Sequence, residues 1–145
     1  MPERATLKRA KEDAREGKAP STQAGEFVKE EMDHIREGKH GARSTKQAIA
    51  IGLSKARRAG VTLPARGSTA TRKKAAQDTR AAKSPHKVSA KRSRATEGAL
   101  KREGHSAASH IALSRQAKKS AASRGKAARS QAAKKAAATR ARRAA

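Results

Sequence analysis

Paired basic residues are the side chains of this sequence best suited to chemistry. Lysine and arginine recur in pairs with small residues between them, at Lys73-Lys74, Lys91-Arg92, Lys118-Lys119, Lys134-Lys135 and Arg142-Arg143. Such cations bind phosphate oxygens, and small spacers let the backbone lie close to a phosphate surface. Phe occurs once and Tyr and Trp are absent, which nearly excludes stacking on bases. The pattern predicts nucleic-acid binding through backbone phosphates, without sequence preference.

The distribution of charge localises this activity. Residues 1–40 contain nine Lys/Arg and nine Asp/Glu, whereas residues 41–145 contain 28 Lys/Arg and three acidic residues and so carry the whole net charge of +25. A neutral head with a polycationic tail is typical of an interaction tail. We expect phosphate contacts from Lys46, Lys55, Arg57, Arg58, Arg72, Lys73, Lys74, Lys87, Lys91, Arg92, Arg115, Lys118, Lys119, Lys134, Lys135, Arg140, Arg142 and Arg143.

Other kinds of chemistry find little support in the residue pattern. Cysteine is absent, which excludes thiolate metal sites and cysteine nucleophiles. The histidines are scattered along the chain without carboxylate or thiol partners at ligand spacing (His34, His40, His86, His105 and His110). The acidic residues of the head are interpreted as salt bridges on solvent-facing helix surfaces. We expect no metal, no cofactor and no enzymatic activity.

Large apolar residues gather in one part of the chain, between Phe27 and Leu63. Their spacing predicts two helices within residues 20–63, with a core of Phe27, Val28, Met32, Ile35, Ile49 and Leu53. Ser21 or Thr22 is expected to cap the first helix with Glu26 as a capping-box partner, and Ser44 or Thr45 to cap the second. Gly52 is expected to allow the two helices to approach closely.

The predicted fold class is mostly α with extensive disorder. Residues 1–19 are expected to form a charged helix or arm, residues 20–63 the αα-hairpin, residues 64–105 a basic flexible linker, and residues 106–145 a basic Ala-rich tail. The tail is rich in strong helix formers but repels itself, so it is expected to be disordered or a long helix that forms conditionally, when phosphate binds.

A weak internal repeat leaves two interpretations open. Arg-Glu-Gly occurs at residues 15–17, 36–38 and 102–104, and Ile51–Lys55 resembles Ile111–Arg115. Arg-Glu-Gly is a convenient helix end in a charged chain, which explains the repeat without ancestry. A duplicated helix–turn–helix unit is the alternative.

Two resemblances add to this picture. Residues 64–145 resemble in composition the Lys/Ala-rich C-terminal domains of histone H1-like proteins, and Ser84-Pro85-His86-Lys87 has the Ser-Pro-x-Lys form. Val28 to His34, Glu37-Gly38-Lys39 and Lys46 to Ala56 resemble a short bacterial domain of unknown function with a "KQAIAIALS-A" helix, over about residues 25–60. Gly52 stands where alanine is commoner in that helix. The second resemblance implies a bacterial source and assigns no activity.

The leading hypothesis is a nucleoid-associated DNA-binding protein of the cytoplasm. An RNA- or ribosome-associated basic protein is the first alternative, because backbone electrostatics alone does not separate DNA from RNA. A protein-interaction or plasmid-maintenance factor acting through residues 20–63, by self-association or a protein partner, is the second. No membrane span or secretory signal is predicted, because no apolar run is long enough.

Overall fold

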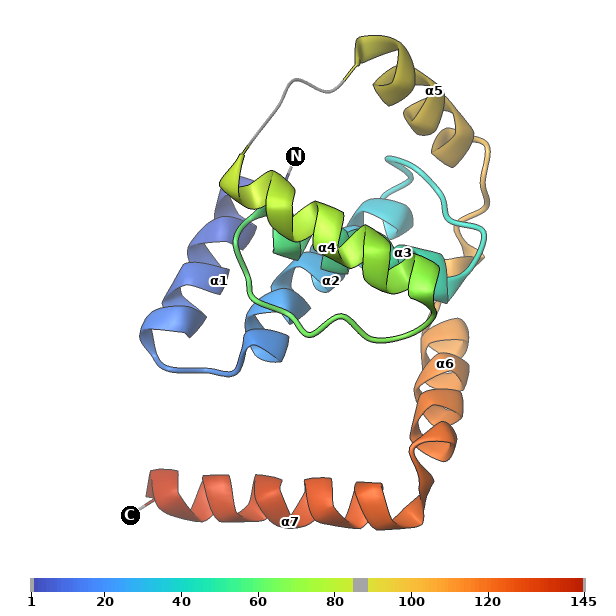
Figure 1. The fold of residues 1–145 in the computed structure, drawn as a ribbon. Coiled ribbons are helices and arrows are strands. Elements are labelled where there is room, and N and C mark those ends of the chain that lie inside the picture. The colour runs from blue at the N-terminus through green and yellow to red at the C-terminus, as the bar shows by residue number, and fades with distance from the viewer. Residues whose placement is uncertain (1, 85–88, 145) are drawn as a thin grey trace. The chain divides into compact units, whose positions relative to one another are not determined.

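The computed structural model describes residues 2–84 and 89–144, with residues 143 and 144 described by their backbone alone. The described chain is mostly helical, as predicted, and contains no strand. Its elements, drawn in Figure 1, are α1 (Arg4–Arg15), α2 (Pro20–Arg36), α3 (Thr45–Arg58), α4 (Thr69–Lys83), α5 (Ala90–Lys101), the 3-10 helix η1 (Ser106–Ala108), α6 (His110–Ser123) and α7 (Gly125–Ala144). The chain divides into two compact units, residues 1–109 and residues 110–145.

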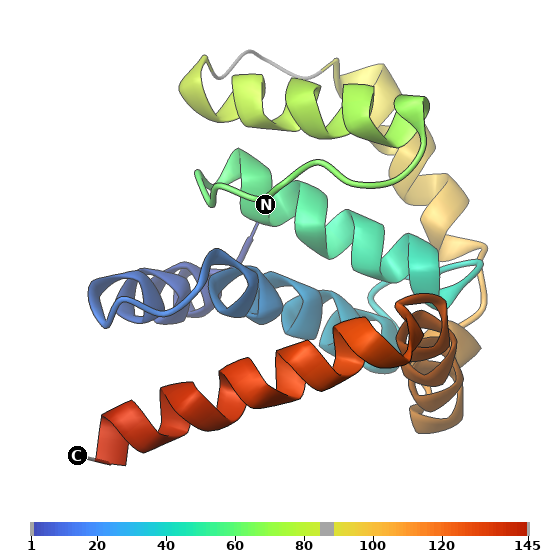
Figure 2. The same ribbon diagram turned by 60° about the horizontal axis from the view of Figure 1, so that its bottom comes forward.

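The first unit is built around helix α2. Helices α1 and α3 both pack against α2, and α4 packs on the other side of α3, so that Figure 2 shows α4, α3 and then α1 with α2 in successive layers. Phe27 and Ile35 are the largest fully buried apolar side chains, and most of the other buried apolar residues are alanines. Leu7, Leu53, Val61 and Leu63 close the cluster around Phe27. The packed unit is therefore larger than the predicted hairpin.

The interface between α2 and α3 is unusually close because its α3 side consists of small residues. Ala48, Gly52 and Ala56 follow one another at a spacing of four and are all buried. A Cβ atom built on Gly52 would lie 2.7 Å from Val28 Cα. This confirms the predicted close approach and explains why alanine does not fit here. The predicted core residues Phe27, Met32 and Ile35 are buried, whereas Val28, Ile49 and Leu53 are half-buried.

Glycines in left-handed conformation end the first three helices. Gly17, Gly38 and Gly60 have φ values of 68°, 76° and 95°. After α2, Lys39 N donates to His34 O over 3.0 Å and Gly38 N donates to Ile35 O over 3.2 Å, which is the Schellman pattern. The first two Arg-Glu-Gly segments therefore serve as helix ends. Gly104, in the third, does not have positive φ.

Helix beginnings agree only in part with expectation. Ser44 caps α3, and its Oγ accepts a bond of 3.2 Å from Gln47 N. The predicted cap at Ser21 or Thr22 is wrong, because α2 already begins at Pro20 and its N-cap residue is Ala19. Proline suits this first position because the amide it lacks has no partner within the helix.

Residues 100–108 dock on the loop between α2 and α3. Gly41 N donates to Leu100 O over 2.9 Å, and Ala42 N donates to Gly104 O over 3.0 Å. Thr45 Oγ1 donates to Ala107 O over 2.7 Å. The side chains of Ala107 and Ala108 are buried. This connection therefore belongs to the first unit, residues 1–109, which is called the head from here on.

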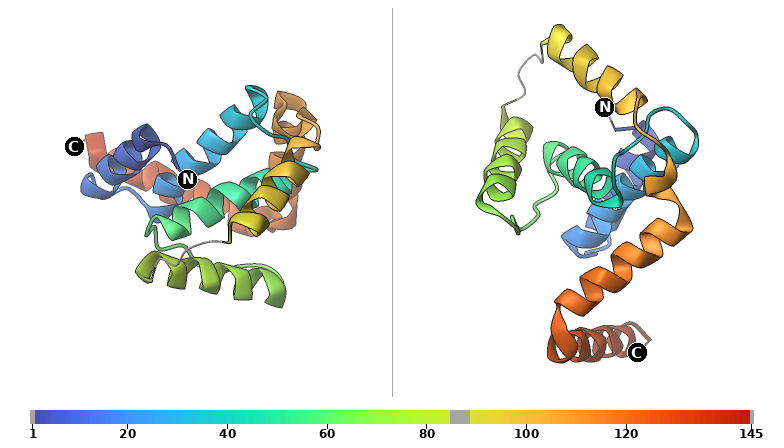
Figure 3. Two further views of the ribbon diagram at one scale, coloured as in Figure 1. Left: turned by 90° about the horizontal axis from the view of Figure 1, so that it is seen from above. Right: turned by 90° about the vertical axis from the view of Figure 1, so that its right-hand side faces the viewer.

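The expectation of extensive disorder is not supported by the structure. Residues 64–145, as far as they are described, contain α4, α5, α6 and α7. Alanine, lysine and arginine favour helix strongly, which outweighs the absence of large apolar residues in deciding local structure. Helix α4 also packs on α3, whereas α5 packs against no other helix of the described chain (Figure 3).

Candidate nucleic-acid interface

The second unit presents a continuous series of unneutralised cations. Residues 110–145 contain eleven Lys/Arg and no Asp or Glu. The ten of these cations whose side chains are described are all exposed: Arg115, Lys118, Lys119, Arg124, Lys126, Arg129, Lys134, Lys135, Arg140 and Arg142. Every one is therefore available to an external anion.

The two helices of this unit arrange these cations differently. In α6, Arg115, Lys118 and Lys119 are three and four residues apart and share one face. In α7, Lys134 and Lys135 are neighbours and point about 100° apart around the helix. Helix α7 has 20 residues, a length of about 30 Å, which equals roughly nine base pairs of duplex DNA. The unit thus carries one cationic face and one helix that is cationic all round.

The sequence-based prediction did not include Arg124, Lys126 and Arg129, none of which has a basic neighbour. They lie in the same acid-free run as the predicted residues and are equally exposed. The absence of acidic residues from Gly104 onward was the signal that includes them.

The predicted cations of the head differ in availability. Lys46, Arg72, Lys73, Lys91 and Arg92 are exposed. Arg57 is half-buried, and its Nε has no hydrogen-bond partner within the described part of the chain. Lys87 and the Ser-Pro-x-Lys segment lie outside the described residues, apart from Ser84, as does the side chain of Arg143.

Arg58 and Lys74 are engaged by a buried acid, Asp78, whose carboxylate is 2% exposed. Asp78 accepts bonds from Ser54 Oγ at 2.7 Å, Arg58 Nε at 3.0 Å and Lys74 Nζ at 3.2 Å. Burial acts to raise the pKa of Asp78, but the bonds from its three partners outweigh burial and hold the pKa below its ordinary value. This acid attaches α4 to α3.

Lys55 is turned into the head instead of toward solvent. Its Nζ lies 2.8 Å from Glu31 Oε2 and 3.1 Å from Glu30 Oε1. Burial acts to lower the pKa of Lys55, but the two carboxylates outweigh it and raise the pKa above its ordinary value. Lys55 therefore stays charged in the interior, and its charge is already compensated.

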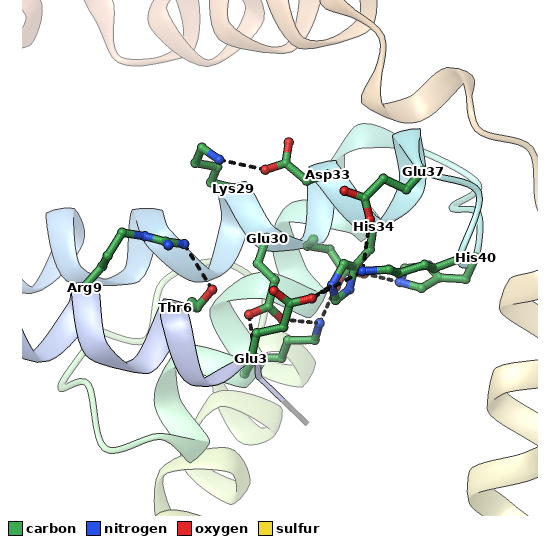
Figure 4. A network of polar contacts seen from close by, with 12 residues as sticks. Glu3, Thr6, Arg9, Lys29, Glu30, Asp33, His34, Glu37 and His40 are labelled. Atoms are coloured by element: carbon green, nitrogen blue, oxygen red, sulfur yellow. Dashed lines mark hydrogen bonds and ion pairs between the residues drawn. The ribbon is translucent and has the colours of Figure 1, made fainter.

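Figure 4 shows the network that surrounds this pair. Glu30 accepts a bond of 2.9 Å from Glu3 N, and Glu3 Oε1 lies 2.9 Å from His34 Nε2 and 3.3 Å from Lys39 Nζ. Burial acts to raise the pKa of Glu30, but hydrogen bonds from the Glu3 amide and its other donors hold it below the ordinary value. The network fixes the beginning of α1 against α2.

These contacts correct two expectations about the head. Its acidic residues do not all face solvent, since Glu30 is 4% exposed and Glu31 is 0% exposed. Two of the histidines are not isolated either, because Glu31, His34 and His40 each place one potential ligand atom within 4.8 Å of the others. Glu31 and His34 are three residues apart on α2, but His40 comes from the loop that follows this helix. Only the Schellman turn at Gly38 brings the three together.

The comparisons with known proteins concern the head. Residues 14–67, just over a third of the chain, match a family whose description is "Family of unknown function (DUF6496)". The match covers the end of α1, all of α2 and α3, and the segment that follows. It supports the predicted resemblance to a domain of unknown function, and it does not extend to the basic tail. No curated protein matches the chain, and no solved structure matches it.

No helix within the described residues is both long enough and apolar enough to cross a bilayer.

Proposed function

We propose that this protein binds nucleic acid, DNA in the first place, through backbone phosphates contacted by the second unit. The observation that carries the proposal is the unit's eleven Lys/Arg without one acidic residue, with every described cation exposed. In the head, by contrast, cations such as Lys18, Lys39 and Lys55 lie within ion-pair distance of carboxylates. Per residue, uncompensated positive charge is therefore densest in the second unit.

The absence of Phe, Tyr and Trp from this unit defines the mode of binding. Without these rings to stack on bases, affinity comes from phosphate contacts and the release of bound counterions. Phosphate also relieves repulsion among the cations of α6 and α7, so binding stabilises these helices. Binding should therefore be strong at low salt, weak at high salt and nearly independent of sequence.

The test is the salt dependence of binding to a random-sequence duplex, followed by fluorescence anisotropy. If about ten cations contact phosphates, the logarithm of the association constant falls against the logarithm of salt concentration with a slope near −9. A slope shallower than about −3 would rule out the multi-phosphate mechanism.

RNA is the second candidate, because the same electrostatics serves any phosphate backbone. Competition between duplex DNA and ribosomal RNA at equal phosphate concentration separates the two. Preferential displacement of the DNA by RNA would favour the ribosome-associated alternative. A chain that ends at Pro64, and so lacks α6 and α7, would keep its cellular effect if the protein-interaction alternative holds.

A further inference from the structure

We propose that Glu31, His34 and His40 bind a divalent transition-metal ion of the zinc type. One potential ligand atom from each residue lies within 4.8 Å of the other two. Two imidazole nitrogens and one carboxylate oxygen form a donor set that zinc takes in proteins, with a fourth position open to water. Magnesium and calcium prefer oxygen ligands alone, so the set discriminates against them.

Glu31 Oε1 is a buried acceptor without a hydrogen-bond donor within the described residues. The Glu31 side chain is fully buried, and neither carboxylate oxygen accepts a bond of hydrogen-bonding geometry within the described part of the chain. Lys55 Nζ compensates the charge at Oε2 from 2.8 Å. Oε1 faces His40 Nε2 instead, at 3.5 Å. A buried carboxylate oxygen without a hydrogen-bond donor is costly, and a metal ion at Oε1 would satisfy it.

The separation of the ligand atoms fits a metal ion between them. With metal–ligand distances of about 2.0 Å and tetrahedral angles, two ligand atoms lie about 3.3 Å apart. Glu31 Oε1 and His40 Nε2, at 3.5 Å, already meet this requirement. His34 lies within the 4.8 Å limit, so a shift of its ring of at most about 1.5 Å completes the site.

Both histidines are oriented by partners of the kind that metal-binding histidines use. His40 Nδ1 lies 3.1 Å from Gly41 O, so the Nδ1–H group donates to this carbonyl and Nε2 keeps its lone pair toward Glu31. His34 Nε2 lies 2.9 Å from Glu3 Oε1, so an Nε2–H group donates to the carboxylate and leaves the lone pair on Nδ1. Figure 4 shows the contact between His34 and Glu3, with the ring of His40 near that of His34.

The site is accessible to an ion from solvent. Glu31, His34 and His40 line a cleft of about 730 Å³ in the first unit, to which Leu100 and Thr96 of α5 also contribute. The side chains of His34 and His40 are 13% and 16% exposed. The proposal is independent of nucleic-acid binding by the second unit, because all its residues lie in the first.

The experiment is isothermal titration of the full-length, metal-free protein with ZnCl2, with MgCl2 as the comparison ion. We expect one equivalent of Zn²⁺ to bind, no comparable binding of Mg²⁺, and a loss of affinity of tenfold or more in both His34→Gln and His40→Gln. His110→Gln is the matched control, because His110 is exposed in the second unit, and it should bind like the unaltered chain.

Co²⁺ provides a second readout that does not depend on stability. The unaltered protein loaded with Co²⁺ should show the intense visible absorption of a four-coordinate site, and His40→Gln should lose it. The proposal is overturned if the unaltered protein binds no Zn²⁺, if Mg²⁺ binds equally well, or if the His34→Gln/His40→Gln double variant binds Zn²⁺ with unchanged affinity.

Discussion

Replacement of Gly52 by alanine should destabilise the head, although alanine favours helix over glycine by about 1 kcal/mol. The added Cβ would lie 2.7 Å from Val28 Cα and 3.0 Å from Phe27 O. Both are backbone atoms, so relief requires α2 and α3 to separate by roughly an ångström. Overpacking of this kind costs about 1–3 kcal/mol, and after the gain in helix propensity we expect a net loss of up to about 2 kcal/mol in the free energy of unfolding.

Gly25 offers a matched control within α2. It is exposed, and a Cβ placed there meets nothing within 4 Å. Gly25→Ala should therefore stabilise the protein by up to about 1 kcal/mol. The two substitutions are chemically identical, so a comparison of the two cancels their common effect on the unfolded chain.

Urea denaturation followed by far-ultraviolet circular dichroism measures both variants, since the chain has no Trp or Tyr to report by fluorescence. The midpoint for Gly52→Ala should fall, by up to roughly 1 M, relative to the unaltered protein. The midpoint for Gly25→Ala should rise slightly. If Gly52→Ala stabilised the protein as much as Gly25→Ala, the close approach of α2 and α3 would be refuted.

Two further substitutions and one titration test other contacts of the head. Asp78→Asn should lower the free energy of unfolding by on the order of 1–3 kcal/mol and speed amide hydrogen exchange in α4. The control Glu97→Gln removes an exposed ion pair and should change stability little. Equal exchange rates of the α4 amides in the two variants would contradict the anchoring role of Asp78. Gly41→Ala places a Cβ 1.9 Å from the backbone oxygen of Glu103. It should therefore displace the docked segment around Glu103 and make the chain sensitive to trypsin at Arg102. The control Gly104→Ala has open space around the added Cβ and should not change the cleavage. The pKa values of Asp78 and Glu30 are lowered in the folded protein, so as the pH falls the unfolded chain takes up protons before the folded chain does. The free energy of unfolding should therefore decrease below about pH 5. In Asp78→Asn this decrease should be less steep, as urea denaturation at several pH values would measure.

The helices of residues 4–58 were predictable because their local signals are strong. Apolar spacing placed Phe27, Met32 and Ile35 on one face, the hydroxyl of Ser44 indicated the start of α3, and Gly38 indicated the end of α2. Each of these signals lies within one or two helical turns of the feature that it predicts. No tertiary information was needed.

The docking of α4 and of residues 100–108 was not predictable from such local signals. It depends on Asp78, a single acid in a basic segment, and on Ala107 and Ala108, which are too small to register as core residues. Their burial follows from the fit between surfaces far apart in sequence. Apolar patterning therefore underestimates a fold whose core consists largely of alanine.

The cluster of Glu31, His34 and His40 was missed for a related reason. The interval between His34 and His40 is not a helical spacing, and only the chain reversal after α2 brings His40 back toward Glu31. The charge pattern of the tail, in contrast, depends on composition alone. It could be read directly from the sequence.

The most direct test of the central claim compares two charge-neutralised variants of the full-length chain. One replaces Lys134, Lys135, Arg140 and Arg142 of α7 by glutamine, and the other replaces Arg4, Lys8, Lys11 and Arg15 of α1, so that both lose four positive charges. If the second unit carries phosphate binding, the α7 variant should show a salt slope shallower by about 3–4 and the α1 variant should bind duplex DNA nearly as the unaltered protein does. Equal losses in the two variants would show that net charge alone governs binding, and would contradict the account.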